Sequence, residues 1–304
     1  KSRFNHLKYK MNNHLKYKIG IIGLGVLGSG IANHILKQKI KLFGYDISRK
    51  HIKNLDKNYF KLCSSPQELF KKSDVVITCL SSEQSLIEIS NQSTSDVLII
   101  ETSTLPLECK ETAKNNILKN KASIVDSPLS GNRIAALNGE LSSYLSGKKR
   151  DKKIANYILN LFCKKVTDVG SFGNGIVMKL IGNILNLVHN AVTAEVMLLG
   201  MKSGLSPKII HEAISGTFSS SGVFENRGKL MINEDYSKEG MNFSIPLKDS
   251  KLITDLSRDK AVGIPIYQVA LQYYYSAVAH GFKDKDASSV LKALEKNFNF
   301  KRPG

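Results

Sequence analysis

The 304-residue sequence predicts an α/β protein in which a doubly wound N-terminal domain precedes an all-α domain built around one long helix. Three observations predict this fold. A glycine-rich turn follows the first apolar run, strand-like and helix-like segments alternate through the first half, and almost nothing strand-like remains after Gly170. We expect residues 17–172 and 173–304 to form the two domains.

The glycine-rich turn has the spacing G-x-G-x-x-G and directly follows the apolar run that begins at Ile19. In this motif the first glycine permits a tight turn, the second lets the backbone approach a pyrophosphate, and the third lets the helix pack closely on the sheet. The N-terminus of the following helix offers N–H groups to the anion. We therefore expect a Rossmann-type dinucleotide site. Its turn residues are Gly23, Leu24, Gly25, Val26, Leu27 and Gly28.

Asp46 ends the second apolar run, about 20 residues after the glycines, where a ribose-binding carboxylate is expected. A carboxylate there accepts hydrogen bonds from the ribose hydroxyls and repels a 2′-phosphate, so Asp46 favours NAD. Arg49 follows three residues later and keeps NADP possible. The alternative for the whole pattern is a structural turn in some other α/β sheet.

The first half contains seven short apolar segments that we expect to form strands, several of them buried on both faces in a mostly parallel sheet. They are residues 18–22, 41–46, 74–80, 96–102, 123–127, 142–146 and 165–169. Helices are expected between them. Pro66 and Pro106 mark two helix starts, because the N–H that proline lacks is unpaired in the first turn.

One long helix is predicted from residue 173 to about residue 203, because apolar residues recur there at helical spacing. They are Ile176, Leu180, Ile184, Leu187 and Ala191. A long apolar helix tends to be buried all round, so we expect it to pack against a second subunit, in a homodimer or homotetramer. Further helices are predicted at residues 206–214, 246–258, 265–280 and 286–296.

Composition narrows the class of protein. The net charge is +18, but the lysines are spread along the chain with no nucleic-acid-binding motif, so we expect no nucleic-acid partner. No run reaches the roughly 18 apolar residues of a membrane span, and no membrane association is expected. The cysteines are scattered, so we expect no metal site and a reducing cytoplasmic setting. They are Cys63, Cys79, Cys109 and Cys163.

The N-terminus carries a repeated basic hexapeptide, Asn-His-Leu-Lys-Tyr-Lys, at residues 5–10 and 13–18. The second copy continues into the first predicted strand. We expect residues 1–16 to form a flexible extension.

Candidate catalytic residues lie on the long helix. Lys179 and Asn183 are four residues apart, so they share one face of an otherwise apolar segment. Burial would lower the pKa of the lysine and make it a better proton acceptor near neutral pH. The alternative is a lysine whose amine extends to solvent at the helix start.

Two further segments hold candidate binding residues. Ser130, Gly131 and Asn132 follow a strand-like run and could form an anion nest for a carboxylate, or a plain strand-to-helix turn. Lys248 stands beside Asp249 at the start of a later helix, where a surface ion pair is the alternative.

In this order and spacing, the four segments resemble the β-hydroxyacid dehydrogenase family, which includes 3-hydroxyisobutyrate dehydrogenase and belongs to the 6-phosphogluconate dehydrogenase superfamily. The resemblance covers nearly the whole chain from about residue 17 to residue 298. The matching motifs are the glycine turn, D-x-P-x-S-G at 126–131, G-x-G-x-x-x-K-x-x-x-N at 173–183, and K-D at 248–249.

The resemblance implies a role for each segment. Lys179 would be the general acid/base, and Asn183 would help to hold the substrate. Ser130, Gly131 and Asn132 would bind its carboxylate. The residues expected to line the cofactor groove are Thr78, Cys79, Leu80, Ser103 and Lys248.

The resemblance therefore predicts an NAD(P)-dependent oxidoreductase that interconverts a small anionic 3-hydroxy acid and its semialdehyde, such as 3-hydroxyisobutyrate, tartronate semialdehyde or succinic semialdehyde. Asn132 stands where the family motif has a second glycine, so we expect a more hydroxylated acid. The alternatives are the imine-reducing branch, 6-phosphogluconate dehydrogenase itself, and a non-catalytic relative that senses nucleotides or binds nucleic acid. Lys179 argues against the imine-reducing branch and against a non-catalytic relative. The chain length argues against 6-phosphogluconate dehydrogenase.

Overall fold

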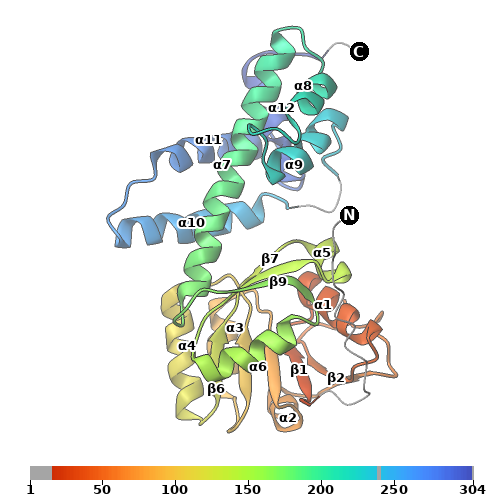
Figure 1. The fold of residues 1–304 in the computed structure, drawn as a ribbon, viewed down its shortest axis with the longest axis vertical. Coiled ribbons are helices and arrows are strands. Elements are labelled where there is room, and N and C mark those ends of the chain that lie inside the picture. Colours follow the sequence, from red (N-terminus) through yellow and green to blue (C-terminus); the bar gives the residue numbers. More distant parts are fainter. Residues whose placement is uncertain (1–15, 238–240, 303–304) are drawn as a thin grey trace.

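The computed structural model describes residues 16–237 and 241–302. It has a layered α/β part and an all-helical part, and the long helix α7 (Asn174–Lys202) runs from one into the other (Figure 1). Nearly all of the predicted N-terminal extension lies outside the described residues.

The main sheet has six parallel strands in the order β3-β2-β1-β4-β5-β6, and its strand order reverses between β1 and β4. Ligands of open α/β sheets bind beside such a reversal, at the carboxyl ends of the strands. The predicted doubly wound fold is confirmed. The strands are β1 (Ile19–Ile22), β2 (Leu42–Tyr45), β3 (Phe60–Leu62), β4 (Val75–Thr78), β5 (Leu98–Glu101) and β6 (Ser123–Asp126).

Alternate residues of the central strands feed two hydrophobic layers. Val75 and Ile77 of β4 pack into one layer, and Val76 between them packs into the other. Helices α1 (Val26–Lys37) and α6 (Lys149–Leu159) contribute to the first layer. The helices of the second layer are α2 (Pro66–Lys72), α3 (Glu83–Asn91) and α4 (Leu107–Lys119).

A second, three-stranded sheet follows. Two segments predicted to continue the parallel sheet, 142–146 and 165–169, belong instead to this sheet as β8 (Leu141–Leu145) and β9 (Cys163–Asp168). β8 also pairs antiparallel with the two-residue strand β7 (Leu129–Ser130). The short helix α5 (Arg133–Asn138) connects β7 to β8.

The second half of the described chain is helical, as predicted, and α7 is its central element. Four of the five apolar residues that predicted α7 are buried, and Ile184 is partly buried. The remaining helices are α8 (Pro207–Ile214), α9 (Gly222–Asn233), α10 (Ser244–Asp259), α11 (Pro265–Ala279) and α12 (Val290–Asn297), preceded by a 3-10 turn at Ala287–Ser289.

One side of α7 is apolar and exposed within the single chain. Its residues follow one another at intervals of three, four or seven positions and so form a stripe along the helix. They are Ile181, Leu185, Val192, Val196 and Leu199. By length and composition α7 could cross a membrane, although core helices of soluble proteins meet the same criteria. Its other side packs into the core of the helical domain.

Candidate active site

The glycine turn has the shape of a phosphate cradle. Gly23 has φ +92°, and a Cβ there would lie 2.2 Å from the carbonyl oxygen of Cys79. A Cβ on Gly28 would lie 2.0 Å from the carbonyl oxygen of Gly23. Among the described residues, no atom beyond the chain neighbours lies within 4 Å of a Cβ built on Gly25. Protein packing therefore requires the outer two glycines, whereas Gly25 borders open space that a diphosphate would fit.

Asp46 lies against this turn at the carboxyl end of β2. Its Oδ2 accepts a hydrogen bond from the backbone N–H of Leu24 at 2.5 Å, and its Oδ1 accepts one from the N–H of Ser48 at 2.6 Å. Each carboxylate oxygen can accept a second bond. The carboxylate is thus held in place with capacity left for ribose hydroxyls.

Residues after β4 and β5 form the neighbouring wall. The hydroxyl of Ser103 accepts a hydrogen bond from the N–H of Leu80 at 2.9 Å, which ties the two strand ends together. Cys79 lies between the glycine turn and this wall. Burial raises the pKa of its thiol to about 11, so it is a neutral lining group and not a nucleophile.

The predicted substrate loop is fixed at both ends. Ser130 pairs with Ser142 across the small sheet. Gly131 has φ +135°, and a Cβ there would lie 2.7 Å from the Leu141 side chain. The side-chain oxygen of Asn132 caps α5 by accepting a hydrogen bond from the N–H of Ala135 at 3.0 Å. The amide oxygen of Asn132 is therefore engaged in capping α5.

Helix α5 anchors this loop to the cofactor side of the domain. A Cβ on Gly30 of α1 would lie 2.8 Å from Cβ of Ala136 in α5, so the two helices are in close contact. The glycine turn and the substrate loop therefore belong to one rigid unit. In the described part of the chain, no hydrogen bond joins this loop to Lys179.

Lys179 lies in the second turn of α7 and is partly buried. Desolvation by burial lowers the pKa of its amine, Asp249 opposes this shift, and Lys248 adds to it. The lysine is thus poised to exchange a proton closer to neutral pH than a free lysine would.

Asp249 is the residue that organises this face of the helical domain. It is 3% exposed, and its Oδ2 accepts a hydrogen bond from the side-chain nitrogen of Asn183 at 2.8 Å. Burial raises the pKa of its carboxyl, opposed by Lys248, Lys179 and the Asn183 bond. The sequence identified Asp249 only as part of the K-D motif and gave it no role in the site.

Lys248 reaches back to the α/β part. Its Nζ donates a hydrogen bond to the carbonyl oxygen of Thr104 at 3.0 Å and lies 3.8 Å from Oδ1 of Asp249. Thr104 directly follows Ser103, so the amine of Lys248 lies on the predicted cofactor wall. The ion pair that was the alternative is also present, as the contact of the half-exposed Lys248 with Asp249.

A buried ionic cluster beneath the site was missed by the sequence analysis. Lys110 of α4 contacts both Glu101 at the end of β5 and Asp126 at the end of β6. Desolvation lowers the pKa of Lys110, but the two carboxylates outweigh it and the net shift is upward. The sequence marked Asp126 as a motif residue only.

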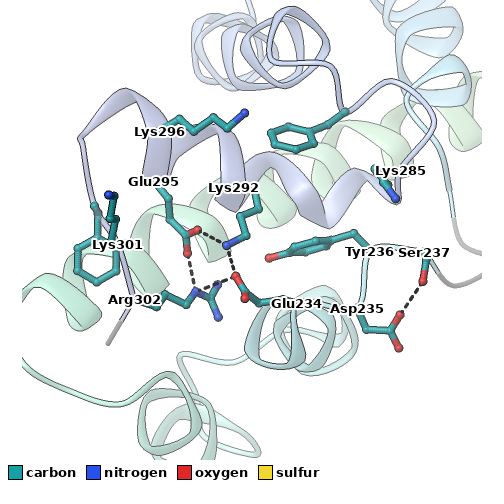
Figure 2. Close-up of a pocket in the computed structure, with 12 residues that line it drawn as sticks. Glu234, Asp235, Tyr236, Ser237, Lys285, Lys292, Glu295, Lys296, Lys301 and Arg302 are labelled. Atoms are coloured by element: carbon teal, nitrogen blue, oxygen red, sulfur yellow. Dashed lines mark hydrogen bonds and ion pairs between the residues drawn. The ribbon is translucent and has the colours of Figure 1, made fainter. Parts of the chain in front are cut away.

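A separate hollow of about 670 Å³ lies in the helical domain beside α12 (Figure 2). Glu234 and Glu295 there bind the side chains of Lys292 and Arg302. These ion pairs fasten the C-terminal segment to α12. The hollow contains none of the predicted site residues.

A phosphate cradle at the reversal of a parallel sheet, with a desolvated lysine on the adjoining helical domain, defines a dinucleotide-dependent oxidoreductase. Family models agree. Residues 18–170 match the NAD-binding domain of 6-phosphogluconate dehydrogenase, and residues 173–294 match the NAD-binding domain of NADP-dependent 3-hydroxyisobutyrate dehydrogenase. The chain belongs to the β-hydroxyacid dehydrogenase family and is an NAD(P)-dependent hydroxyacid dehydrogenase.

Individual relatives match over nearly their whole length. L-threonate dehydrogenase of Cupriavidus necator is 28% identical over 90% of this chain and 95% of its own. The mitochondrial 3-hydroxyisobutyrate dehydrogenase of Rattus norvegicus is 29% identical over 94% and 89%, respectively. Among solved structures, 3-hydroxyisobutyrate dehydrogenase of Mycobacterium tuberculosis with L-serine has a TM-score of 0.83 at 21% identity, covering 92% of this chain and 99% of that one.

Proposed function

We propose that the enzyme interconverts a small 3-hydroxy acid and its semialdehyde, with Lys179 as the general acid/base. The observation that carries this proposal is the partly buried amine of Lys179, whose pKa is lowered, on the helix face that also presents Asn183 to Asp249. A proton acceptor with that property is what the oxidation of a hydroxyl requires.

The bound nicotinamide dinucleotide supplies hydride acceptance in one direction and hydride donation in the other. During oxidation, Nζ of Lys179 accepts the proton of the substrate hydroxyl. During reduction, the same amine returns a proton to the carbonyl oxygen. Asn183 holds the substrate beside this amine, and its bond to Asp249 fixes the direction of the amide.

The cofactor residues follow from the turn and the two strand ends. Gly25 leaves space for the diphosphate, and Asp46 presents its carboxylate to the ribose hydroxyls. Because a carboxylate repels a 2′-phosphate, we propose a preference for NAD over NADP. Ser103 and Lys248 complete the wall on the nicotinamide side.

The substrate carboxylate would be held by Ser130 and by the backbone N–H groups of Gly131 and Asn132. The side-chain nitrogen of Asn132 is then available to a hydroxyl group of the substrate, because its oxygen caps α5. The relative named L-threonate dehydrogenase supports a hydroxylated acid as the substrate. We propose such an acid ahead of 3-hydroxyisobutyrate.

Two aspects of organisation belong to this proposal. The boundary between the domains would lie near residue 172, at the start of α7. A homodimer or homotetramer would cover the exposed stripe of α7.

A cytoplasmic location is proposed from the four free cysteines, which suit a reducing compartment. Several relatives are named as mitochondrial.

The test is NADH oxidation by the purified enzyme against a panel of small semialdehydes and 2-oxo acids, repeated with Lys179→Ala. We expect turnover with at least one semialdehyde, and a fall in kcat of roughly 10²-fold or more in the variant, which is the usual range for a lost general acid/base. NADH affinity should change little. Lys202→Ala, at the opposite end of α7, is the matched control. Unchanged turnover in Lys179→Ala would refute the proposed role.

A further inference from the structure

We propose that Lys110 is a positioning residue, which fixes the first turn of α7 through Asp126 and thereby sets the place of Lys179. The inference rests on the proposed function of Lys179. It concerns a group that neither the family motifs nor the proposed mechanism uses.

The cluster is completely enclosed. The side chains of Lys110, Glu101 and Asp126 are all 0% exposed. Nζ of Lys110 lies 2.5 Å from Oε2 of Glu101 and 2.6 Å from Oδ1 of Asp126. A buried carboxylate without a partner is strongly disfavoured, and the single lysine is the cationic partner of both carboxylates.

The second oxygen of Asp126 caps α7. Its Oδ2 accepts a hydrogen bond from the backbone N–H of Ile176 at 2.8 Å. The hydroxyl of Ser146 accepts another from the N–H of Gly175 at 3.0 Å. The N-cap residue of α7 is Gly173, which has no side chain to supply a cap. The first turn of this helix is therefore capped by side chains from the α/β part.

Charge and spacing favour the same role. Two carboxylates and one ammonium leave the cluster with one net negative charge, next to the positive end of the α7 dipole. Lys179 follows Ile176 by three residues, which is about 4.5 Å along the helix axis. A shift of the capped turn is passed directly to Lys179, and displacements of this kind can change rates by orders of magnitude.

The other carboxylate serves the cofactor wall. Oε1 of Glu101 accepts a hydrogen bond from the N–H of Ser103 at 2.8 Å, and the Ser103 hydroxyl in turn accepts from the N–H of Leu80. One buried lysine therefore links two sets of contacts. Its ion pair with Asp126 connects it to α7, and its ion pair with Glu101 connects it to the cofactor wall.

The test compares two isosteric variants, Asp126→Asn and Glu101→Gln, in the full-length enzyme. Each leaves Lys110 paired with one carboxylate, so folding should be affected similarly. In each variant an amide nitrogen replaces one carboxylate oxygen, so at least one contact of that carboxylate is lost. For Asp126 these contacts are with Lys110, the N–H of Ile176 and, at 3.3 Å, the hydroxyl of Ser146. We measure kcat, the NADH dissociation constant, and hydrogen exchange of the peptide covering residues 174–180.

The variants Asp126→Asn and Glu101→Gln should have different effects on turnover and on NADH binding. In Asp126→Asn we expect faster exchange in residues 174–180 and a loss in kcat of at least roughly tenfold, with a smaller change in NADH affinity. In Glu101→Gln we expect weaker NADH binding, a smaller loss in kcat, and native exchange in α7. Lys110→Met should show both sets of changes.

Equal losses in the two variants, or native exchange in Asp126→Asn, would overturn the inference. Failure of the proposed function has a different signature. Lys179→Ala would then remain active, while exchange in α7 would still report on the cap. If Lys110→Met does not fold, the two isosteric variants still decide the question.

Discussion

The side-chain nitrogen of Asn183 donates a hydrogen bond to Oδ2 of Asp249 across 2.8 Å, and this bond joins α7 to α10 inside the helical domain. The same carboxylate acts electrostatically on Lys179, one turn before Asn183 on α7. Asp249 therefore orients one predicted substrate-binding residue and modulates the predicted proton carrier.

The pH dependence of oxidation should reveal this coupling. Because burial lowers the pKa of Lys179, the rate should rise with pH at lower values than a free lysine would allow and then level off. Asp249 opposes the shift, so Asp249→Asn should move the rising limb to lower pH. The measurement is kcat/KM for oxidation as a function of pH. Asp255→Asn removes a partly exposed carboxylate of α10 that pairs with Lys251 and Arg258, and it should leave the limb in place. A limb that moves upward in Asp249→Asn would contradict the assignment.

Cofactor selectivity should depend on Asp46. Asp46→Ala should weaken NAD binding by roughly tenfold or more, since hydrogen bonds to charged groups are the stronger ones. The affinity for NADP should fall by a smaller factor or should rise. The measurement is the ratio of kcat/KM with NAD to kcat/KM with NADP. This ratio separates lost selectivity from a loosened glycine turn, because a loosened turn would weaken the binding of both cofactors. Asp56→Ala, an exposed carboxylate outside the turn, is the control. A native enzyme that already prefers NADP would show the selectivity proposal to be wrong.

Two glycines of the same turn should respond in opposite ways to alanine. At Gly25 φ is −66° and a Cβ meets no atom of the part of the chain that the structure describes. Gly25→Ala should therefore keep its melting temperature but bind NADH roughly tenfold more weakly or worse. At Gly28 a Cβ would lie 2.0 Å from a backbone oxygen, so Gly28→Ala should lower the melting temperature. Thermal melts and NADH titration of both variants check this. Undiminished NADH affinity in Gly25→Ala would place the diphosphate elsewhere.

The exposed stripe of α7 should govern assembly. Leu185→Glu places a charge in the middle of the stripe, where burial against a second subunit would be strongly disfavoured. We expect a smaller species by analytical ultracentrifugation than for the native enzyme. Leu62→Glu, an exposed leucine on β3, should leave the mass unchanged. A native enzyme that sediments as a monomer would contradict the prediction that the stripe is a subunit interface.

The sequence predicted best what depends on local pattern. The glycine turn, Asp46 and α7 are all encoded in contiguous stretches, and the structure places them as expected. β3 and β7 were missed because three and two residues carry too little pattern. Helix α9 was missed because only Phe224, Gly228 and Met231 of its twelve residues are buried, which leaves a weak apolar pattern.

Long-range partners could not be predicted in the same way. Asn183 and Asp249 are 66 residues apart, and Lys110 and Asp126 are 16 apart on different elements. Nothing in the local sequence of α4 distinguishes Lys110 from the lysines around it. Only the fold reveals that this lysine is buried between two carboxylates.

Because α7 is long, a small change in its direction at the capped end becomes a large displacement at the opposite end. Twenty-nine residues span about 43 Å, so a tilt of about 5° at the Ile176 end swings the opposite end by about 4 Å. The apolar stripe extends toward that opposite end. If the proposed homodimer or homotetramer forms, a second protomer bound to the stripe would restrain such a tilt, and the position of each lysine at its substrate would then depend on the whole assembly.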